Sequence, residues 1–147
     1  MAKPKDVTAA LDALDHPLRD QIDYVRALTR SLGGPGTGEE ATVGGSGTEG
    51  GSGDITEQWK WSAPTFSVGS DYLFTFHLRP TEYLHLVVHH PDAPTVDSPM
   101  LEGDYPDGRR MIYLRGRGEL VSGEPELRRV LLELIHRTRE RAASTHP

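Results

Sequence analysis

One segment of the sequence, from residue 72 to residue 90, constrains the fold more than any other. Its two apolar runs, residues 72–78 and 82–90, flank the turn-forming Arg79-Pro80-Thr81, so the segment predicts a β-hairpin. Successive side chains of a strand point to opposite faces, and the expected register places the even-numbered apolar residues on one buried side. The expected buried residues are Phe74, Phe76, Leu78, Leu84, Leu86 and Val88. The other side is expected to carry Leu73, Thr75, His77, Tyr83, His85, Val87 and His89.

A sheet with one apolar face needs helices to cover it, and the sequence supplies them at both ends. Residues 7–14 and 18–32 have apolar side chains at helical spacing, with Pro17 expected in the first turn of the second helix. A third helix is expected to start between residues 122 and 125. Further strands are expected at residues 55–61, 65–68 and 109–115. Because the chain lacks the long crossovers of parallel pairing, we predict an α+β fold. Its sheet is expected to be mainly antiparallel, with about five to six strands and with the N- and C-terminal helices packed on one face.

The chain has 147 residues and is expected to form a single domain, residues 1–147, with a flexible insertion at residues 33–54. Ten of the 22 residues in this insertion are glycine, a composition that is typical of a flexible coil. Lengthening a loop from about five residues to about 22 costs only ~1.3 kcal/mol by the logarithmic closure law, so a domain tolerates it. The same composition is also typical of an engineered linker.

Charge and composition exclude several classes of protein. The formal net charge is −6 and the pI is about 5.6, which argues against a nucleic-acid partner because phosphates need a basic surface. The chain has no cysteine, which excludes disulfides, thiolate chemistry and Cys-ligated zinc. No apolar run reaches the ~20 residues of a membrane span, and the N-terminus lacks the apolar core of a secretory signal. We therefore expect no membrane partner and a cytoplasmic location.

The motifs that mark common enzyme classes are absent from the sequence. There is no G-x-S-x-G, no P-loop, and no G-x-G-x-x-G that follows a strand. The glycines at residues 44–53 follow a helix and a coil, so they lack the strand–loop–helix context that holds a phosphate. We expect a protein that is not an enzyme and that has no catalytic residue.

Two groups of side chains are candidates for a metal site. On the expected N-terminal helices, two pairs of carboxylates stand three residues apart, close enough to share a hard cation. On the polar sheet face, His77 and His85 are expected as neighbours within reach of imidazole contact. Each group has a plainer alternative, since helical carboxylates are usually solvated and a wet sheet face can carry scattered histidines. The acidic candidates are Asp12, Asp15, Asp20 and Asp23.

The segment ITEQWKWSAPTF, residues 55–66, resembles the signature of the YdhG-like family, whose domain has no assigned function. The segment from Pro17 to Arg19 resembles the start of a helix in that family, and residues 107–110 precede a strand in the family's order. The likeness extends from residue 7 to about residue 140. It departs from the family at the long insertion and at residues 91–108, where many members have a helix. The residues that carry the likeness are Glu57, Trp59, Lys60, Trp61, Pro64, Thr65 and Phe66.

The resemblance implies an α+β sandwich similar in outline to frataxin. Some members of the family are described as frataxin-like intracellular iron chaperones, so iron is the cofactor that the resemblance implies. In frataxin-type proteins the acidic residues of the first helix and the nearby strand edge hold iron. Here the comparable acidic ridge is thin, and it is interrupted by Arg19 and Arg26.

The Lys60-Trp61 motif allows two interpretations. In the first, Lys60 and Trp61 form a surface that binds a ligand or a partner. In the second, the motif is the end of a strand and a proline-directed turn, and Trp61, Pro64 and Phe66 serve packing. Because Trp59 and Trp61 would share one face of a strand, the second interpretation predicts that both are buried.

Two functions remain open, besides a less favoured enzyme that acts on a small molecule at the Lys60 end of the sheet. The first is a frataxin-like intracellular protein that binds iron through surface carboxylates. The second is a metal-free protein-interaction module that presents its open sheet face to a protein partner or to a second copy in a homodimer. Binding of ferrous iron would discriminate the two.

Overall fold

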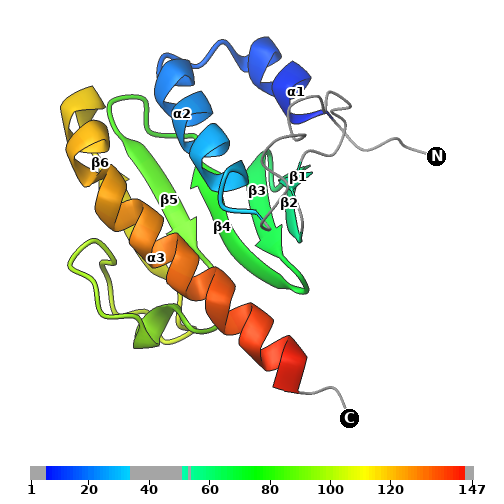
Figure 1. The fold of residues 1–147 in the computed structure, drawn as a ribbon. Helices are drawn as coiled ribbons and strands as arrows, with labels where there is room; N and C mark the ends of the chain where they lie inside the picture. Colours follow the sequence, from blue (N-terminus) through cyan, green and yellow to red (C-terminus); the bar gives the residue numbers. More distant parts are fainter. Residues whose placement is uncertain (1–5, 34–50, 53, 145–147) are drawn as a thin grey trace.

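The computed structural model describes residues 6–33, 51–52 and 54–144, which form an α+β sandwich of helices on a sheet. Six antiparallel strands lie in the order β1-β2-β3-β4-β5-β6, so each pairs with its neighbour in the sequence. Figure 1 shows the three α-helices over one side of this sheet, which confirms the predicted fold class. The strands are β1 Gly51–Ser52, β2 Ile55–Lys60, β3 Ala63–Val68, β4 Asp71–His77, β5 Leu84–Val88 and β6 Arg110–Leu114. The helices are α1 Val7–Leu14, α2 Arg19–Arg30, the 3₁₀ helix η2 Ala93–Thr95 and α3 Gly116–Ser144.

The hairpin of β4 and β5 has the register that the sequence parity predicts. Phe74 pairs with Val88 and Phe76 with Leu86, and all four side chains are buried. Burying each such side chain contributes about 1.5–3 kcal/mol, so this face of the sheet supplies much of the stability. The core beneath the helices is one cluster of buried residues, to which all three α-helices and strands β2 to β6 contribute.

Leu73 is an exception to this parity, and its predicted place on the polar face is wrong. The register of β3 and β4 shifts, because Phe66 pairs with Phe74 whereas Ser67 pairs with Tyr72. Leu73 is therefore the extra residue of a β-bulge, a feature that locally interrupts the alternation of side chains. Leu73 and Phe74 are both fully buried as a result.

Helix α2 begins at Arg19, and Pro17 precedes it instead of lying in its first turn. The ring of His16 holds this junction, because His16 Nδ1 accepts a hydrogen bond from the backbone N–H of Leu18 over 3.0 Å. The same ring donates from Nε2 to the carbonyl oxygen of Leu78 over 2.8 Å. His16 thereby ties the start of α2 to the chain that leaves β4.

Helix α3 begins at Gly116, well before the predicted start between residues 122 and 125. Proline favours the first turn of a helix, but Pro125 lies inside α3. The earlier start is stabilised by Leu120, whose side chain is fully buried in the core. At the start of the helix, Glu119 accepts a hydrogen bond from the backbone N–H of Arg115 over 2.7 Å.

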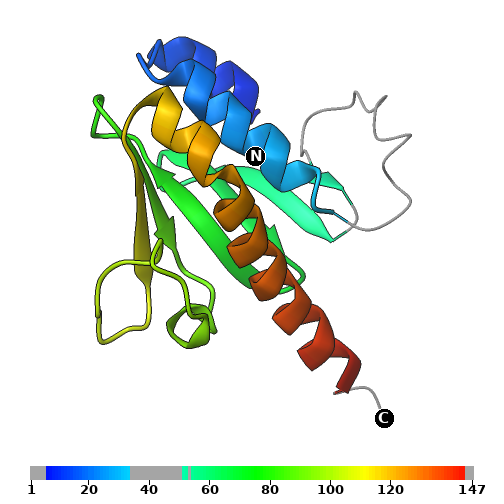
Figure 2. The ribbon, with the colours of Figure 1, turned by 60° about the vertical axis from the view of Figure 1, so that its left-hand side comes forward.

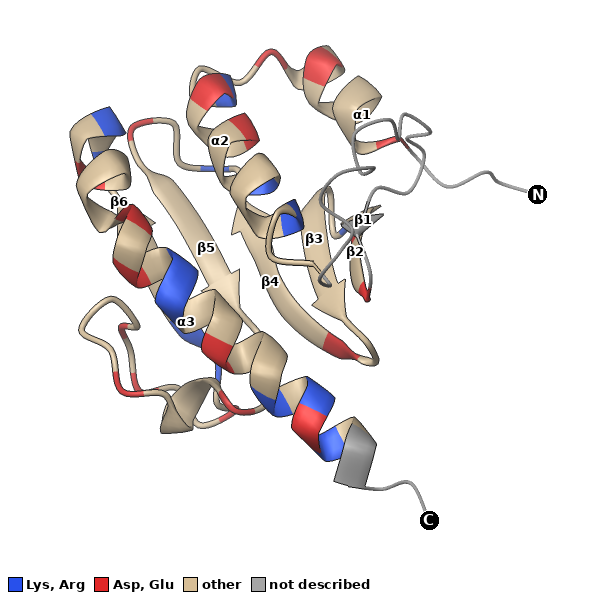
Figure 3. Ribbon diagram, in the orientation of Figure 1, with Lys and Arg blue, Asp and Glu red and all other residues tan. Residues whose placement is uncertain are grey.

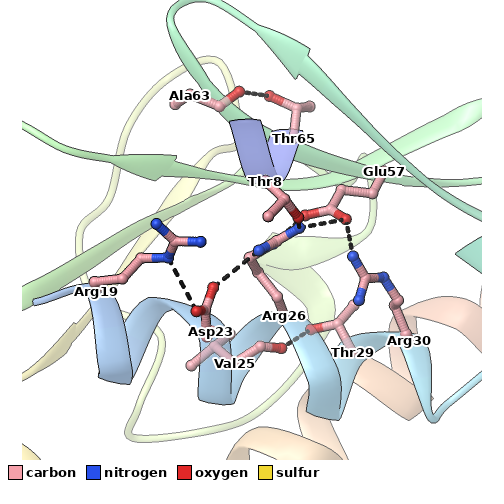
Figure 4. A network of polar contacts seen from close by, with 10 residues as sticks. All are labelled: Thr8, Arg19, Asp23, Val25, Arg26, Thr29, Arg30, Glu57, Ala63 and Thr65. Carbon is pink, nitrogen blue, oxygen red and sulfur yellow. Dashed lines mark hydrogen bonds and ion pairs between the residues drawn. The ribbon is translucent and has the colours of Figure 1, made fainter. Parts of the chain in front are cut away.

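A buried ion network joins α2 to β2 on the helix side of the sheet (Figure 4). The carboxylate of Glu57 accepts a hydrogen bond from Arg26 Nε over 2.6 Å and another from Arg30. Arg26 also donates to Asp23 over 2.8 Å and to Thr8 over 3.1 Å. A buried carboxylate requires such partners, because an unpaired charge is costly to remove from water. Glu57, one of the motif residues, therefore serves to hold α2 against β2.

Most of the predicted insertion at residues 33–54 lies outside the described residues. Its described end differs from a coil, because β1 Gly51–Ser52 pairs with Ile55 and Thr56 of β2. Across the described helices, none combines the length and the apolar character that crossing a membrane requires.

Candidate functional site

The sheet face opposite the helices, here called the outer face, is built from alternate residues of β2 to β6. In Figure 2 the three α-helices lie on the same side of the sheet, so none of them covers the outer face. None of the strand residues on this face is an Asp or Glu, although the chain carries a net charge of −6; the carboxylate beside it is that of Glu102, which pairs with Met111 in an isolated bridge. Figure 3 shows acidic residues mainly on helices and loops. The outer-face residues are Thr56, Gln58, Lys60, Thr65, Ser67, Tyr72, Thr75, His77, His85, Val87, Met111 and Tyr113.

Trp61 lies in the tight turn between β2 and β3, and its predicted burial is wrong. Lys60 pairs with Ala63, so Trp61 and Ser62 are the two central residues of this hairpin turn. Both have positive φ, 57° for Trp61 and 60° for Ser62, as a type I′ turn requires. The strand thus ends at Lys60, and the Trp61 side chain is 57% exposed. Trp59 does pack partly buried against the core.

The Trp61 ring belongs to an aromatic group on the outer face. Its centroid lies 5.2 Å from that of Tyr72 and 5.5 Å from that of His89. The ammonium group of Lys60 lies 5.1 Å from the Trp61 ring centroid and 5.9 Å from that of Tyr72, distances typical of cation–π contact. These four residues, Lys60, Trp61, Tyr72 and His89, are called the Trp61 cluster below.

Two buried threonines support the Trp61 cluster from the sheet. Thr65 is 0% and Thr75 is 7% exposed, although no helix covers this face, and their hydroxyl oxygens lie 3.1 Å apart. Thr75 Oγ1 also lies 3.0 Å from His89 Nε2, which fixes the His89 ring beside Trp61. Burial, followed by the charge of Arg109, lowers the pKa of His89 against the opposing charge of Asp107.

An open hollow of about 590 Å³ adjoins the Trp61 cluster. It lies where the β2–β3 turn meets the end of β4 and the segment between α1 and α2. Its wall includes the apolar side chains of Leu14, Pro17 and Leu78, and Arg79 and His77 add polar groups. The hollow can therefore take an apolar group next to the exposed face of Trp61.

His77 and His85 form a second group on the outer face, here called the histidine pair. They are direct cross-strand partners, and their Nδ1 atoms lie 3.0 Å apart. The ring of His85 stacks on Tyr113, with centroids 4.6 Å apart, and its Nε2 lies 3.1 Å from Met111 Sδ. Burial, together with the charge of His77, lowers the pKa of His85.

The acidic candidates of the N-terminal helices do not converge on one point. Asp12 and Asp23 both bond to Arg19, over 2.8 and 2.9 Å, and Asp23 also bonds to Arg26. Asp15 ends α1 in the left-handed conformation, with φ 53°, and Asp20 lies in the first turn of α2. Within the described ranges, no group of three or more His, Cys, Asp or Glu side chains has a geometry that could hold a metal ion.

The motif residues divide between the surface and the core. Pro64 and Phe66 are buried in β3, whereas Lys60 and Trp61 lie on the outer face. His89 lies on the face where the strand parity predicted it, but the contribution of Tyr72 could not be anticipated from the sequence. Tyr72 reaches the outer face only because the bulge at Leu73 reverses the parity of β4.

Comparison with known proteins gives no match for this chain among protein-family models, curated proteins or solved structures.

Proposed function

We propose that this protein is a YdhG-like interaction module that binds an acidic protein segment at the Trp61 cluster, without the aid of a metal. The likeness of residues 55–66 supports the family assignment. The exposure of Trp61 beside strand residues that include Lys60 and no carboxylate is the observation that carries the proposed function. The partner is expected to place an apolar side chain in the hollow and carboxylates near Lys60 and Arg79.

The composition of the outer face favours a protein partner. Tryptophan, tyrosine and arginine are enriched among the residues that dominate binding energy at protein interfaces. Aromatic rings with few rotatable bonds, such as those of Trp61 and Tyr72, offer a large contact area at a low entropic cost. Complementary charge favours an acidic partner, because the strand residues of this face include Lys60 and no acid.

The backbone at Trp61 is a second reason to assign a function to this residue. Positive φ disfavours a bulky side chain, and Asn or Gly normally occupies the centre of a type I′ turn. Trp61 and Ser62 occupy it here. Strain of this kind concentrates at functional sites, where the surrounding structure maintains it.

Selection of binding peptides tests the proposal. The purified protein is panned against a displayed peptide library, and the enriched peptides are measured by isothermal titration against wild type and Trp61→Asn. Asparagine is chosen because it tolerates positive φ, which leaves the turn intact. We expect peptides rich in Asp and Glu around one large apolar residue, and a loss of affinity of at least about tenfold in Trp61→Asn.

A matched control distinguishes binding at the Trp61 cluster from nonspecific binding to exposed apolar side chains. Leu132 is an apolar side chain of α3 that is 43% exposed on the helix side of the molecule. Leu132→Ala should bind the selected peptides as wild type does, and EDTA should have no effect. Equal binding to wild type and Trp61→Asn would refute the proposal.

The iron-chaperone function that the resemblance implies has less support from the geometry. Two of its four carboxylates, Asp12 and Asp23, already bond to arginine side chains. Anaerobic titration with ferrous iron tests this function directly. Absence of binding at micromolar iron would remove it, and binding that is lost in Asp15→Asn and Asp20→Asn would establish the acidic ridge as the site.

A further inference from the structure

The histidine pair has a geometry that the Trp61 cluster does not explain. His77 and His85 face each other across β4 and β5, and their Nδ1 atoms are separated by 3.0 Å. The His77 side chain is exposed, and His85 is half-buried. Both side chains extend from regular strands, so the backbone holds the two rings together without a turn or a loop.

The contacts of His85 fix which nitrogen carries its hydrogen. A thioether sulfur can accept a hydrogen bond but cannot donate one, so the contact with Met111 Sδ places the hydrogen of neutral His85 on Nε2. His85 Nδ1 then presents a lone pair to His77. In the neutral pair, the hydrogen between the two rings must therefore belong to His77 Nδ1.

The geometry points to a transition-metal site in which His77 Nδ1 and His85 Nδ1 chelate one imidazole-preferring divalent ion, such as Zn²⁺, with water at its other positions. The ion takes the place of the single hydrogen between the rings and accepts one lone pair from each Nδ1. Neutral His77 keeps its hydrogen, which moves from Nδ1 to Nε2, so both imidazoles remain neutral. No proton is released in this exchange.

The distances suit such an ion. Zinc–nitrogen bonds of about 2.0–2.1 Å at a tetrahedral angle separate the two nitrogens by about 3.3 Å. The two nitrogens need to separate by about 0.3 Å from their present 3.0 Å, and both rings must turn so that their lone pairs converge on an ion beside the line that joins the nitrogens. Met111 Sδ would keep its contact with His85 Nε2 and so orient the ligand, as outer groups do at histidine-ligated metal sites.

The two imidazole ligands also indicate which ions the site can take. Copper and nickel also prefer imidazole, and the usual affinity order places Cu²⁺ above both Ni²⁺ and Zn²⁺. This site uses no residue of the acidic ridge or of the Trp61 cluster, although His77 also lines the hollow. Zinc binding is measured without any peptide, so its outcome is distinguishable from that of the proposed function.

Titration of the full chain with Zn²⁺ tests the inference by calorimetry and by ¹⁵N NMR of the histidine rings. We expect one ion per chain. Without zinc, His77 should show the Nδ1–H form and His85 the Nε2–H form. With zinc, both rings should show the Nε2–H form, with the signals of both Nδ1 atoms shifted. This readout uses the wild-type protein and does not depend on how any variant folds.

Variants give a second, independent measure. His77→Gln and His85→Gln should each weaken zinc binding by more than about tenfold, since loss of even an outer partner of a metal ligand costs about 10–100-fold. His136→Gln is the matched control, because His136 is an exposed histidine of α3 on the other side of the molecule. It should bind zinc as wild type does. Zinc that leaves the ring signals of His77 and His85 unmoved, or that binds both variants as tightly as wild type, would overturn the inference.

Discussion

Arg26 Nε lies 2.6 Å from Glu57 Oε2, and both side chains are almost fully buried between α2 and β2. A second bond of 3.3 Å joins Arg26 to the other carboxylate oxygen, so the contact is bidentate. Arg30 completes the neutralisation of Glu57 from one turn further along α2. This contact fixes the position of α2 over the edge of the sheet that leads into the Trp61 turn.

Removing one partner of this ion pair should destabilise the fold strongly. In Glu57→Ala, Arg26 would remain buried without its main partner, and we expect a loss of about 3–5 kcal/mol in the free energy of unfolding. Replacing both charges, in Arg26→Met with Glu57→Leu, should recover most of that loss. Urea denaturation monitored by circular dichroism measures both variants. A cost below about 1 kcal/mol for Glu57→Ala would contradict the assignment of this pair to the buried network.

Because of the bulge, we expect Leu73 to contribute to the core, whereas strict alternation along β4 would place it on the outer face. Leu73 is fully buried, so Leu73→Ala should lower the free energy of unfolding by about 2–5 kcal/mol. Val87→Ala is the control, because Val87 lies on the outer face and is only half-buried. It should cost about 1 kcal/mol or less. Similar costs for the two variants in urea denaturation would mean that Leu73 lies on the outer face after all.

The layered architecture could be predicted from the positions of the apolar residues, which alternate in the strands and recur at helical spacing in α1 and α2. Even-numbered apolar residues in the β4–β5 hairpin face the same core, as Phe76 and Leu86 show. Apolar spacing likewise located α1 and α2 to within a few residues. The same register predicted that His77 and His85 would be neighbours, and they are direct partners.

The details of the candidate site could not be predicted, because they arise from departures from regular structure. Trp61 was expected to continue β2, since Trp61-Ser62 lacks the Asn-Gly signal of a type I′ turn. Tyr72 joins Trp61 only through the bulge, which depends on how β3 and β4 pair. In α3, a proline suggested a later start, whereas burial of Leu120 decided an earlier one. In each case tertiary packing outweighed the local sequence preference.

Stability should fall as the pH falls through the range in which histidine titrates, and His90 should contribute to this loss. His90 is 1% exposed; its Nδ1 accepts from the Asp92 N–H over 3.0 Å, and its Nε2 donates to Thr138 Oγ1 over 2.6 Å. Burial lowers the pKa of His90, although the charges of Asp71 and Asp92 oppose this and that of Arg141 adds to it. The unfolded chain, in which histidine has its ordinary pKa of about 6.5, therefore takes up a proton first.

The stabilisation from neutral His90 is complete above about pH 6.5 and is lost as the pH falls below it, by at most about 1.4 kcal/mol per pH unit. Urea denaturation at pH 7.5 and at pH 5.5 measures this loss. His90→Gln can still donate to Thr138 but cannot titrate, so it should lose less stability than wild type over the same interval. A loss as large as that of wild type would assign the pH dependence to other groups, such as His85 and His89, whose pKa values are also lowered.

Two substitutions in the β2–β3 turn should separate its effect on stability from its effect on peptide binding. A non-glycine residue at positive φ costs about 1–2 kcal/mol. Glycine avoids this cost, but the greater backbone entropy that it loses on folding offsets about 0.5–1 kcal/mol of the gain. Ser62→Gly, with φ 60° at that position, should therefore raise the free energy of unfolding by about 0.5–1 kcal/mol and leave peptide binding intact. Adding Trp61→Asn to Ser62→Gly should keep a stable turn and weaken peptide binding by at least about tenfold. If Ser62→Gly unfolds more easily than wild type, or if the double variant binds the selected peptides as tightly as wild type, then the strained turn does not serve to present Trp61.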